Sequence, residues 1–327
     1  MNYIQQAYKG KNKWYHWVVT FVLVFCGWQI LGAIPLLVAA VMHSADMTEF
    51  AEAAEDSFMS LGINSNLFLF LMIFMFAIGL LFLIIGVKYI HKRTVTSLVT
   101  SRPKIDWKRF WFGFITWGIL AVFVIGVGIL ISPENYTYNF KAKPFFILLA
   151  ISFLFLPLQT SFEELLFRGY FMQGLGILAK NRWLPLIITS VCFGLLHGAN
   201  PEVEKLGYIA MVFYIGTGFF YGIATLMDEG TELALGLHAV NNIIAAFFVT
   251  TNWTVFQTDA LFIDTSEPSV GWEMFLPVFV LYPLILLFFS KKYGWTNWKE
   301  KLFGKIEKPS MVNDDDNYRV LEDIGTV

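Results

Sequence analysis

Two adjacent acids stand inside an apolar part of the chain and could perform acid–base chemistry there. Glu163 and Glu164 follow an uncharged run, and Arg168 comes shortly after them. On a helix, Glu164 and Arg168 are four residues apart with the acid first, which is the favourable order for an ion pair. Glu163 is turned about 100° away on the same helix and is free to face another group. The alternative is that these charges only mark the end of a membrane helix.

Two histidines and an asparagine follow in later apolar stretches. His197 ends the segment Phe193-Gly-Leu-Leu-His197. His238 and Asn242 are four residues apart, so they share one helix face, whereas Asn241 points elsewhere. Taken singly, His197 is explained as a helix cap, and the other two as polar contacts between membrane helices.

These polar residues cluster between positions 163 and 242, whereas unrelated structural features would scatter along the chain. A carboxylate, imidazoles and an amide could together supply a base that takes a proton from water and donors that stabilise a developing negative charge. Glu163, His197 and His238 would also suit catalytic zinc with an open position. Because no His-Glu-x-x-His motif is present, we favour a site without metal.

The clustered residues resemble the motifs of a known family in their order and spacing. The resemblance covers residues 145–250 and includes every motif residue. It is to the CPBP family, the CAAX proteases and bacteriocin-processing enzymes also called Abi proteins, which includes the type II CAAX prenyl endopeptidases. The three motifs stand here as Glu163-Glu164-x-x-x-Arg168, Phe193-x-x-x-His197 and His238-x-x-x-Asn242.

The resemblance implies an intramembrane peptidase. It implies that Glu163 is the base that activates water and that His197 helps to hold this water. His238 and Asn242 would stabilise the oxyanion. The family was long described as zinc-dependent and is now described as using a metal-independent glutamate mechanism. The supporting residues implied by the motifs are Glu164, Arg168 and Phe193.

Long uncharged stretches supply the elements that must position these residues. Of 327 residues, 57% are hydrophobic and 15% are charged, compared with about half and a quarter in globular proteins. A helix needs about 20 largely apolar residues to cross the hydrocarbon core. We therefore predict an all-α, polytopic membrane protein with about eight transmembrane helices, and we exclude a soluble enzyme, a disordered chain and a nucleic-acid binder. The uncharged stretches are 14–45, 57–87, 110–133, 144–162, 183–201, 206–227, 233–258 and 274–290.

Basic residues set the predicted orientation, because Lys and Arg in short loops are held on the cytoplasmic side. With the N-terminus inside and eight crossings, the inner segments carry 20 Lys and Arg, and the outer loops carry 3. Both termini are therefore predicted to be cytoplasmic. The first outer loop, residues 44–65, is acidic and has no basic residue.

The chain divides into four predicted parts. Residues 1–143 form an N-terminal transmembrane scaffold of three spans, and residues 144–250 form the catalytic core. An outer loop and the last span occupy residues 251–295, and a polar cytoplasmic tail occupies residues 296–327. 

Two further features concern helix packing. Gly218 and Gly222 have GxxxG spacing, which lets a neighbouring helix approach closely. Cys26 and Cys192 fall in separate predicted helices, so no Cys-based metal site is available.

The sequence predicts an integral membrane endopeptidase of a prokaryotic cytoplasmic membrane that hydrolyses a peptide bond of a membrane-associated protein or peptide. The expected partners are membrane lipids and this substrate, with no nucleic acid and no cofactor. Substrate is expected to enter a water-holding cavity from the cytoplasmic half. The alternative is a non-enzymatic membrane immunity or partner-binding protein that keeps the polar residues as a structural core. A transporter is less favoured because no internal repeat is found.

Overall fold

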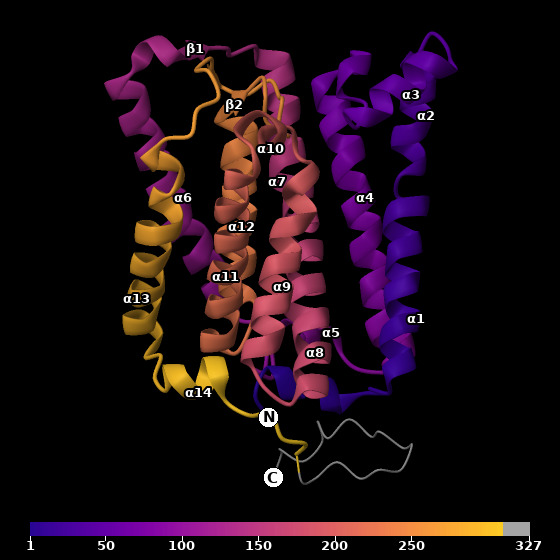
Figure 1. Cartoon of the computed structure of the whole chain (residues 1–327), viewed down its shortest axis with the longest axis vertical. Helices are drawn as coiled ribbons and strands as arrows, with labels where there is room; N and C mark the ends of the chain where they lie inside the picture. The colour runs from indigo at the N-terminus through magenta and orange to yellow at the C-terminus, as the bar shows by residue number, and fades with distance from the viewer. Residues whose placement is uncertain (310–327) are drawn as a thin grey trace.

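The computed structural model describes residues 1–309 as a bundle of long helices with a small sheet at one end (Figure 1). The last part of the predicted tail, residues 310–327, lies outside the described residues. The helices are α1 Trp14–Phe25, α2 Ile34–His43, α3 Met47–Glu55, α4 Ser65–Ile85, α5 Val95–Val99, α6 Trp107–Ile131, α7 Ala142–Glu164, α8 Met172–Ala179, α9 Trp183–Leu196, α10 Pro201–Leu206, α11 Met211–Asp228, α12 Glu232–Phe247, α13 Tyr282–Tyr293 and α14 Trp298–Phe303.

Short π-helical segments join several of these helices into longer rods. Cys26–Leu31 links α1 towards α2, Leu165–Phe171 joins α7 to α8, and Pro277–Leu281 precedes α13. A π-helical turn holds one more residue than an α-helical turn and is common at functional sites. The rod that contains the two adjacent acids therefore runs without a break from Ala142 to Ala179.

Five helical stretches of the described chain are long and apolar enough to cross a membrane, which agrees with an integral membrane protein. Two other uncharged stretches form the shorter apolar helices Trp183–Ala199 and Glu232–Phe247. The count of eight spans stays a prediction. The five long stretches are Trp14–His43, Ser65–Ile90, Trp107–Ile131, Ala142–Ala179 and Tyr208–Asp228.

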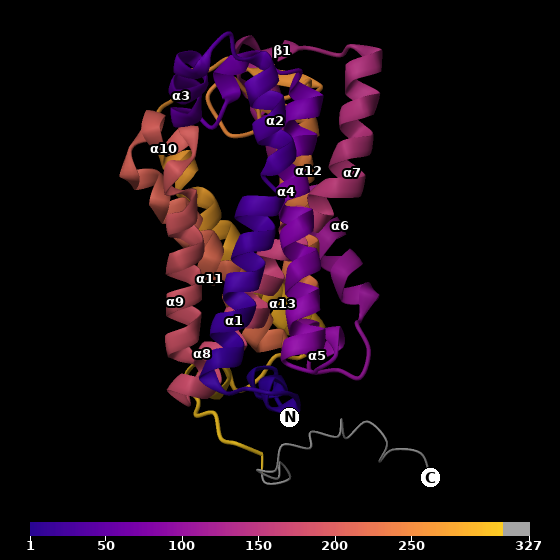
Figure 2. The same cartoon turned by 90° about the vertical axis from the view of Figure 1, so that its right-hand side faces the viewer.

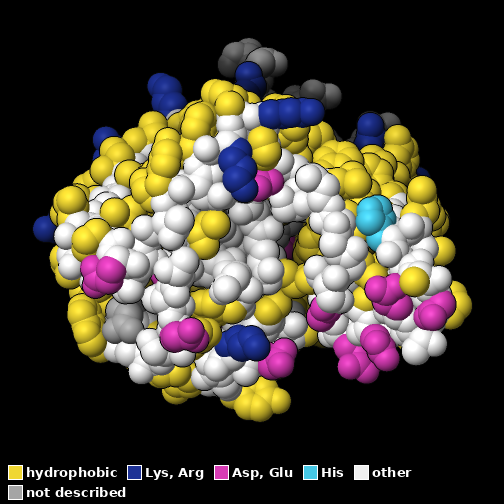
Figure 3. All heavy atoms as spheres, turned by 90° about the horizontal axis from the view of Figure 1, so that it is seen from above, with side chains coloured by type: hydrophobic (Ala, Val, Ile, Leu, Met, Phe, Trp, Pro, Cys, Tyr) yellow, Lys and Arg dark blue, Asp and Glu magenta, His cyan; other side chains and the backbone are white. Residues whose placement is uncertain are grey.

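The charged loops separate to opposite ends of the bundle. The N-terminus, α5, α8 and α14 lie at one end, whereas α3, β1, β2 and α10 lie at the other (Figures 1 and 2). We call the first the basic end, because it collects the segments predicted to be inner, which carry most of the Lys and Arg residues. We call the second the acidic end, because it carries the acidic loop 44–65 and the other segments predicted to be outer. Figure 3 shows the acidic end from above.

A three-stranded sheet covers part of the acidic end and is a departure from the predicted all-α fold. β3 (Phe262–Asp264) pairs antiparallel with β1 (Tyr136–Tyr138) and parallel with β2 (Val249–Thr251). The strands are three residues long, and their partners lie far apart in sequence. The sheet ties the loop after α6 to the segment that follows α12.

A short segment wedged between two helical rods sets the height of α12. This wedge, residues 95–100, runs beneath the turn between α11 and α12, where Thr231 N donates to Val99 O at 2.8 Å. On its other side, Gln173 Nε2 of α8 donates to Ser97 O at 2.9 Å. The α11–α12 turn is thereby held at about the same height along the bundle as Gln173 of α8.

Glycines let α6 and α12 cross in close contact. A Cβ atom added at Gly236 of α12 would lie 2.0 Å from Phe110 O and 2.9 Å from Phe114 N of α6. A Cβ atom at Gly113 of α6 would lie 2.7 Å from Leu233 O. Because backbone atoms fill both spaces, neither position has room for a side chain.

We expect Gly236→Ala to destabilise the protein by about 1–3 kcal/mol, because the added methyl group must push two helix backbones apart. The measurement is the midpoint of thermal unfolding in detergent. Gly126→Ala on α6 is the matched control, since a Cβ atom there meets nothing within 4 Å. Equal midpoints for the two variants would contradict the tight crossing.

Candidate active site

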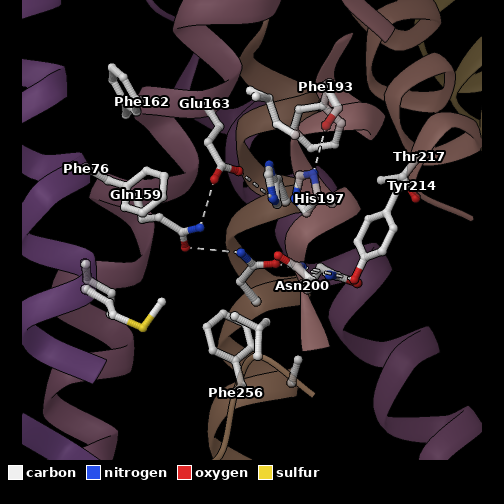
Figure 4. Close-up of a pocket in the computed structure, with 18 of the residues that line it drawn as sticks. Phe76, Gln159, Phe162, Glu163, Phe193, His197, Asn200, Tyr214, Thr217 and Phe256 are labelled. Atoms are coloured by element: carbon white, nitrogen blue, oxygen red, sulfur yellow. Dashed lines mark hydrogen bonds and ion pairs between the residues drawn. The ribbon is translucent and has the colours of Figure 1, made fainter. Parts of the chain in front are cut away.

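A cavity of about 660 Å³ lies between the N-terminal helices and the helices of the predicted core. Glu163, His197, His238 and Asn242 all border it, so the structure brings together the four residues predicted to be catalytic. Figure 4 shows Glu163 and His197 facing the same space. The lining continues to the segment 249–256 at the acidic end.

Glu163 reaches the cavity from the last turn of α7. The residue is 9% exposed, and Gln159 one turn earlier donates Nε2 to Glu163 Oε1 at 3.0 Å. Glu163 Oε2 lies 3.5 Å from His238 Nε2. The carboxylate is therefore held between an amide donor and an imidazole at the edge of the cavity, where it could take a proton from water.

Glu164 and Arg168 form a buried ion pair that connects three helices. Arg168 Nη1 lies 2.9 Å from Glu164 Oε1, and both side chains are 0% exposed. Arg168 Nη2 donates to Gly218 O of α11 at 3.1 Å. His238 Nδ1 of α12 lies 2.9 Å from the same Glu164 oxygen. These contacts let the charged side chains stay inside an apolar bundle, while Glu164 Oε2 and Arg168 Nε are buried without a hydrogen-bond partner.

Aromatic rings cover the guanidinium group of Arg168. Its Cζ atom lies 4.2 Å from the ring centre of Phe193 and 5.5 Å from that of Tyr221. A cation over an aromatic face is stabilised by the electron density of the ring. Phe193 therefore supports the site through Arg168. α9 comes close enough for this contact because a Cβ atom at Gly218 would lie 2.5 Å from Ser190 O.

The wedge explains why His238 reaches the acids. His238 is seven residues beyond Thr231, and Glu164 is nine residues before Gln173, where Thr231 and Gln173 contact opposite sides of the wedge. At 1.5 Å per residue, both side chains stand roughly 10–14 Å above it. A hairpin without the wedge would leave His238 at a different depth.

His238 lies between two carboxylates, and one of them fixes a proton on its ring. Because a carboxylate only accepts, His238 Nδ1 donates to Glu164 Oε1 at 2.9 Å. His238 Nε2 lies 3.5 Å from Glu163 Oε2, so the same ring faces both acids.

His197 follows the last residue of α9 and presents one nitrogen to the cavity. Its Nδ1 lies 2.8 Å from Phe193 O, and because a carbonyl oxygen only accepts, Nδ1 donates. In the neutral ring, Nε2 is then a hydrogen-bond acceptor. The ring stacks on Tyr214 with a centroid separation of 4.6 Å, which holds its orientation.

Amide side chains connect Asn242 to the acid. Asn242 Nδ2 donates to Gln159 Oε1 at 3.2 Å, and Asn241 Nδ2 donates to Asn242 Oδ1 at 3.2 Å. Asn241 Oδ1 in turn accepts from Trp117 Nε1 of α6 at 3.1 Å. These bonds fix the amide plane of Asn242 and leave one of its two N–H groups free to donate.

Several residues of the site have no counterpart in the predicted set. Gln159 bridges Glu163 and Asn242, and it could have been found as a polar residue one helical turn before the acid. Tyr214 and Tyr221 hold the two histidine rings, the second at a centroid separation of 5.0 Å. Tyrosines in apolar helices are common, so their sequence positions carry no comparable signal.

The described side chains bear on the alternative zinc site. Among them, no group of three His, Cys, Asp or Glu is arranged to hold a metal ion. His238 directs Nδ1 to Glu164 and Nε2 to Glu163, so its ring is already engaged with both acids.

Fold and cavity together define a helical membrane protein with a buried acid–histidine site. The family model described as type II CAAX prenyl endopeptidase Rce1-like matches residues 142–244, which contain all of the predicted site residues. The uncharacterized protein YyaK of Bacillus subtilis (strain 168) is 31% identical over 295 residues, which cover 89% of this chain and 97% of that protein. No solved structure matches the chain.

The chain belongs to this family of Rce1-like CAAX endopeptidases, and the resemblance seen in the three motifs is confirmed. Family membership points to an intramembrane protease of the CAAX type.

We expect Arg168→Leu to destabilise the protein by about 3–5 kcal/mol, because Glu164 would keep a buried charge without its partner. The measurement is thermal unfolding in detergent. Lys301→Leu is the control, because the Lys301–Glu229 ion pair is partly exposed and such pairs contribute at most about 1 kcal/mol. The double variant Glu164→Leu with Arg168→Leu should recover part of the loss. Equal losses for Arg168→Leu and Lys301→Leu would show that the buried pair is not essential to the fold.

Proposed function

We propose that the protein is an intramembrane endopeptidase that hydrolyses a peptide bond of a membrane-associated protein or peptide with water activated by Glu163. The observation that carries this proposal is the Glu163–His238 pair, separated by 3.5 Å, at the edge of a cavity that His197 and Asn242 also border. Base, water-holding acceptor and donors thus converge on one space. This is the set of groups that direct amide hydrolysis requires.

In the proposed reaction, these groups act in turn. Glu163 takes a proton from a water molecule that His197 Nε2 helps to hold, and the water oxygen forms a bond to the peptide carbonyl carbon. The carbonyl oxygen becomes an oxyanion that accepts from the protonated Nε2 of His238 and from the free N–H of Asn242. The proton on Glu163 then passes to the amide nitrogen as the C–N bond breaks. The products are a carboxylic acid and an amine.

The membrane arrangement is part of the proposal. We infer that all eight apolar stretches cross or enter the bilayer, and that the basic end faces the cytoplasm because Lys and Arg are retained there. Both termini would then be cytoplasmic and the membrane that of a prokaryotic cell. Lipids surround the bundle, as the many exposed apolar side chains of α1, α2 and α6 require.

We expect Glu163→Gln to lower kcat by about 10²–10⁴-fold, because an amide cannot take a proton from water, while the thermal midpoint changes little. The measurement is cleavage of a membrane-peptide mixture by the purified protein, read by mass spectrometry. Glu204→Gln is the control, since it makes the same chemical change at an exposed acid outside the cavity. If the wild-type protein cleaves nothing while a partner still binds it, the immunity or partner-binding function is supported instead.

We expect peptide cleavage to persist after metal chelation and dialysis, because in the proposed mechanism Glu163 activates water without a metal. The measurement is kcat before and after treatment with a strong chelator. Activity that disappears with the chelator and returns with one equivalent of zinc would establish the zinc mechanism.

A further inference from the structure

The bundle is closed between the candidate site and the basic end. Directly beneath Glu163 lies the fully buried Glu164–Arg168 pair. Beneath that pair, Leu98 of the wedge is 0% exposed and packs against Gly169, where a Cβ atom would lie 3.0 Å from the Leu98 side chain. An ionic layer and an apolar layer thus lie below the cavity in turn.

A hydrogen bond from the N-terminal residues holds this apolar layer on the side of the basic end. The hydroxyl group of Tyr3 donates to Leu98 O at 2.8 Å, and Tyr3 is 0% exposed. Burial raises the pKa of the Tyr3 hydroxyl well above its usual value, so the group stays a donor at physiological pH. The first residues of the chain therefore act as part of the closure.

A second ionic layer closes the basic end itself. Asp228 is 4% exposed, and its Oδ2 lies 2.8 Å from Arg102 Nη2. Arg109 pairs with the other carboxylate oxygen, which also accepts from Trp295 Nε1 at 3.0 Å. Glu232 pairs with Arg102 at 3.1 Å. These contacts join the loop before α6, the α11–α12 turn and the chain after α13.

The cavity extends in the opposite direction. Its lining includes Thr251, Thr254 and Phe256, which follow α12 at the acidic end. This segment forms a rim that is fastened to α10, because Val255 N donates to Glu202 Oε2 at 3.0 Å. Viewed from above, the acidic end is hollowed near its middle (Figure 3).

The charge distribution indicates which side of the membrane the cavity opens to. The basic end carries the Lys and Arg residues that are retained in the cytoplasm, whereas the acidic end carries the acidic loop 44–65. A site closed toward the basic end and open toward the acidic end is therefore closed to the cytoplasm.

We propose that the substrates are membrane-anchored proteins or peptides presented on the extracytoplasmic side, and that their scissile segment enters through the rim formed by residues 249–256. This inference rests on the proposed peptidase function and specifies its substrate class. The cavity wall from α4 is apolar and includes Leu69, Met72 and Ile73, so it fits the apolar end of a membrane anchor. Prenylated tails exposed in the cytoplasm do not reach this opening.

Cysteine accessibility in intact cells tests the sidedness. In a background with Cys26→Ala and Cys192→Ala, Thr254→Cys places a thiol on the rim, and Lys104→Cys places one on the exposed loop before α6. A membrane-impermeant maleimide should label the Thr254→Cys variant from outside. It should label the Lys104→Cys variant only after the cells are permeabilised. Glu204→Cys on exposed α10 is a second reporter for the outer face and should behave as Thr254→Cys does.

The labelling result is independent of catalysis. Labelling of the Lys104→Cys variant in intact cells, with the Glu204→Cys variant protected, would invert the orientation and overturn the proposal. Correct labelling with no peptide cleavage would leave the orientation standing and remove only the peptidase function.

Blocking the rim tests the route to the site. After purification, modification of the Thr254→Cys variant with a bulky maleimide should lower peptide turnover at least about tenfold, whereas modification of the Lys104→Cys variant should leave it unchanged. Unchanged turnover after complete modification at position 254 would show that substrate enters elsewhere and would overturn the proposed route.

Discussion

A charge buried in an apolar bundle must be matched by partners, and Arg168 imposes this requirement on the whole core. Its guanidinium group fixes Glu164, a carbonyl oxygen of α11 and the faces of two aromatic rings. Glu164 in turn orients His238 from α12. Because these contacts join three helices at one point, the neighbouring Glu163 is placed against the cavity, where it faces His238 Nε2. The geometry of the candidate site follows from the way a buried cation is accommodated.

The sequence predicted the local part of this arrangement. Glu164 and Arg168 pair because four residues make one helical turn, and His238 and Asn242 border the cavity together for the same reason. The height of His238 could not be predicted, because it depends on the wedge, residues 95–100, which reaches the α11–α12 turn from another part of the chain. The position of Gln159 one helical turn before Glu163 could have been read from the sequence, but its bond to Asn242 of α12 forms only in the folded protein.

Local sequence also predicted the long helices better than the features that depend on contacts between distant segments. Uncharged stretches identified the long helices, since hydropathy is a property of a single segment. Some helices are shorter than the uncharged stretches that predicted them. The stretch 183–201 forms α9, which ends at Leu196, and then a short turn that begins at His197, the C-cap of the helix. The small sheet could not be predicted from the sequence. Strands of three residues are too short to show an alternating pattern, and β1 pairs with residues about 125 positions away.

The Arg168 contact with Gly218 bears on how this site tolerates mutation. The acceptor is a main-chain oxygen, so no codon change at position 218 can delete it. What a codon change can do is add bulk, and any side chain there meets the main chain of α9 at Ser190. A substitution at position 218 therefore changes the volume between the two helices, while the peptide bond itself preserves the acceptor for Arg168.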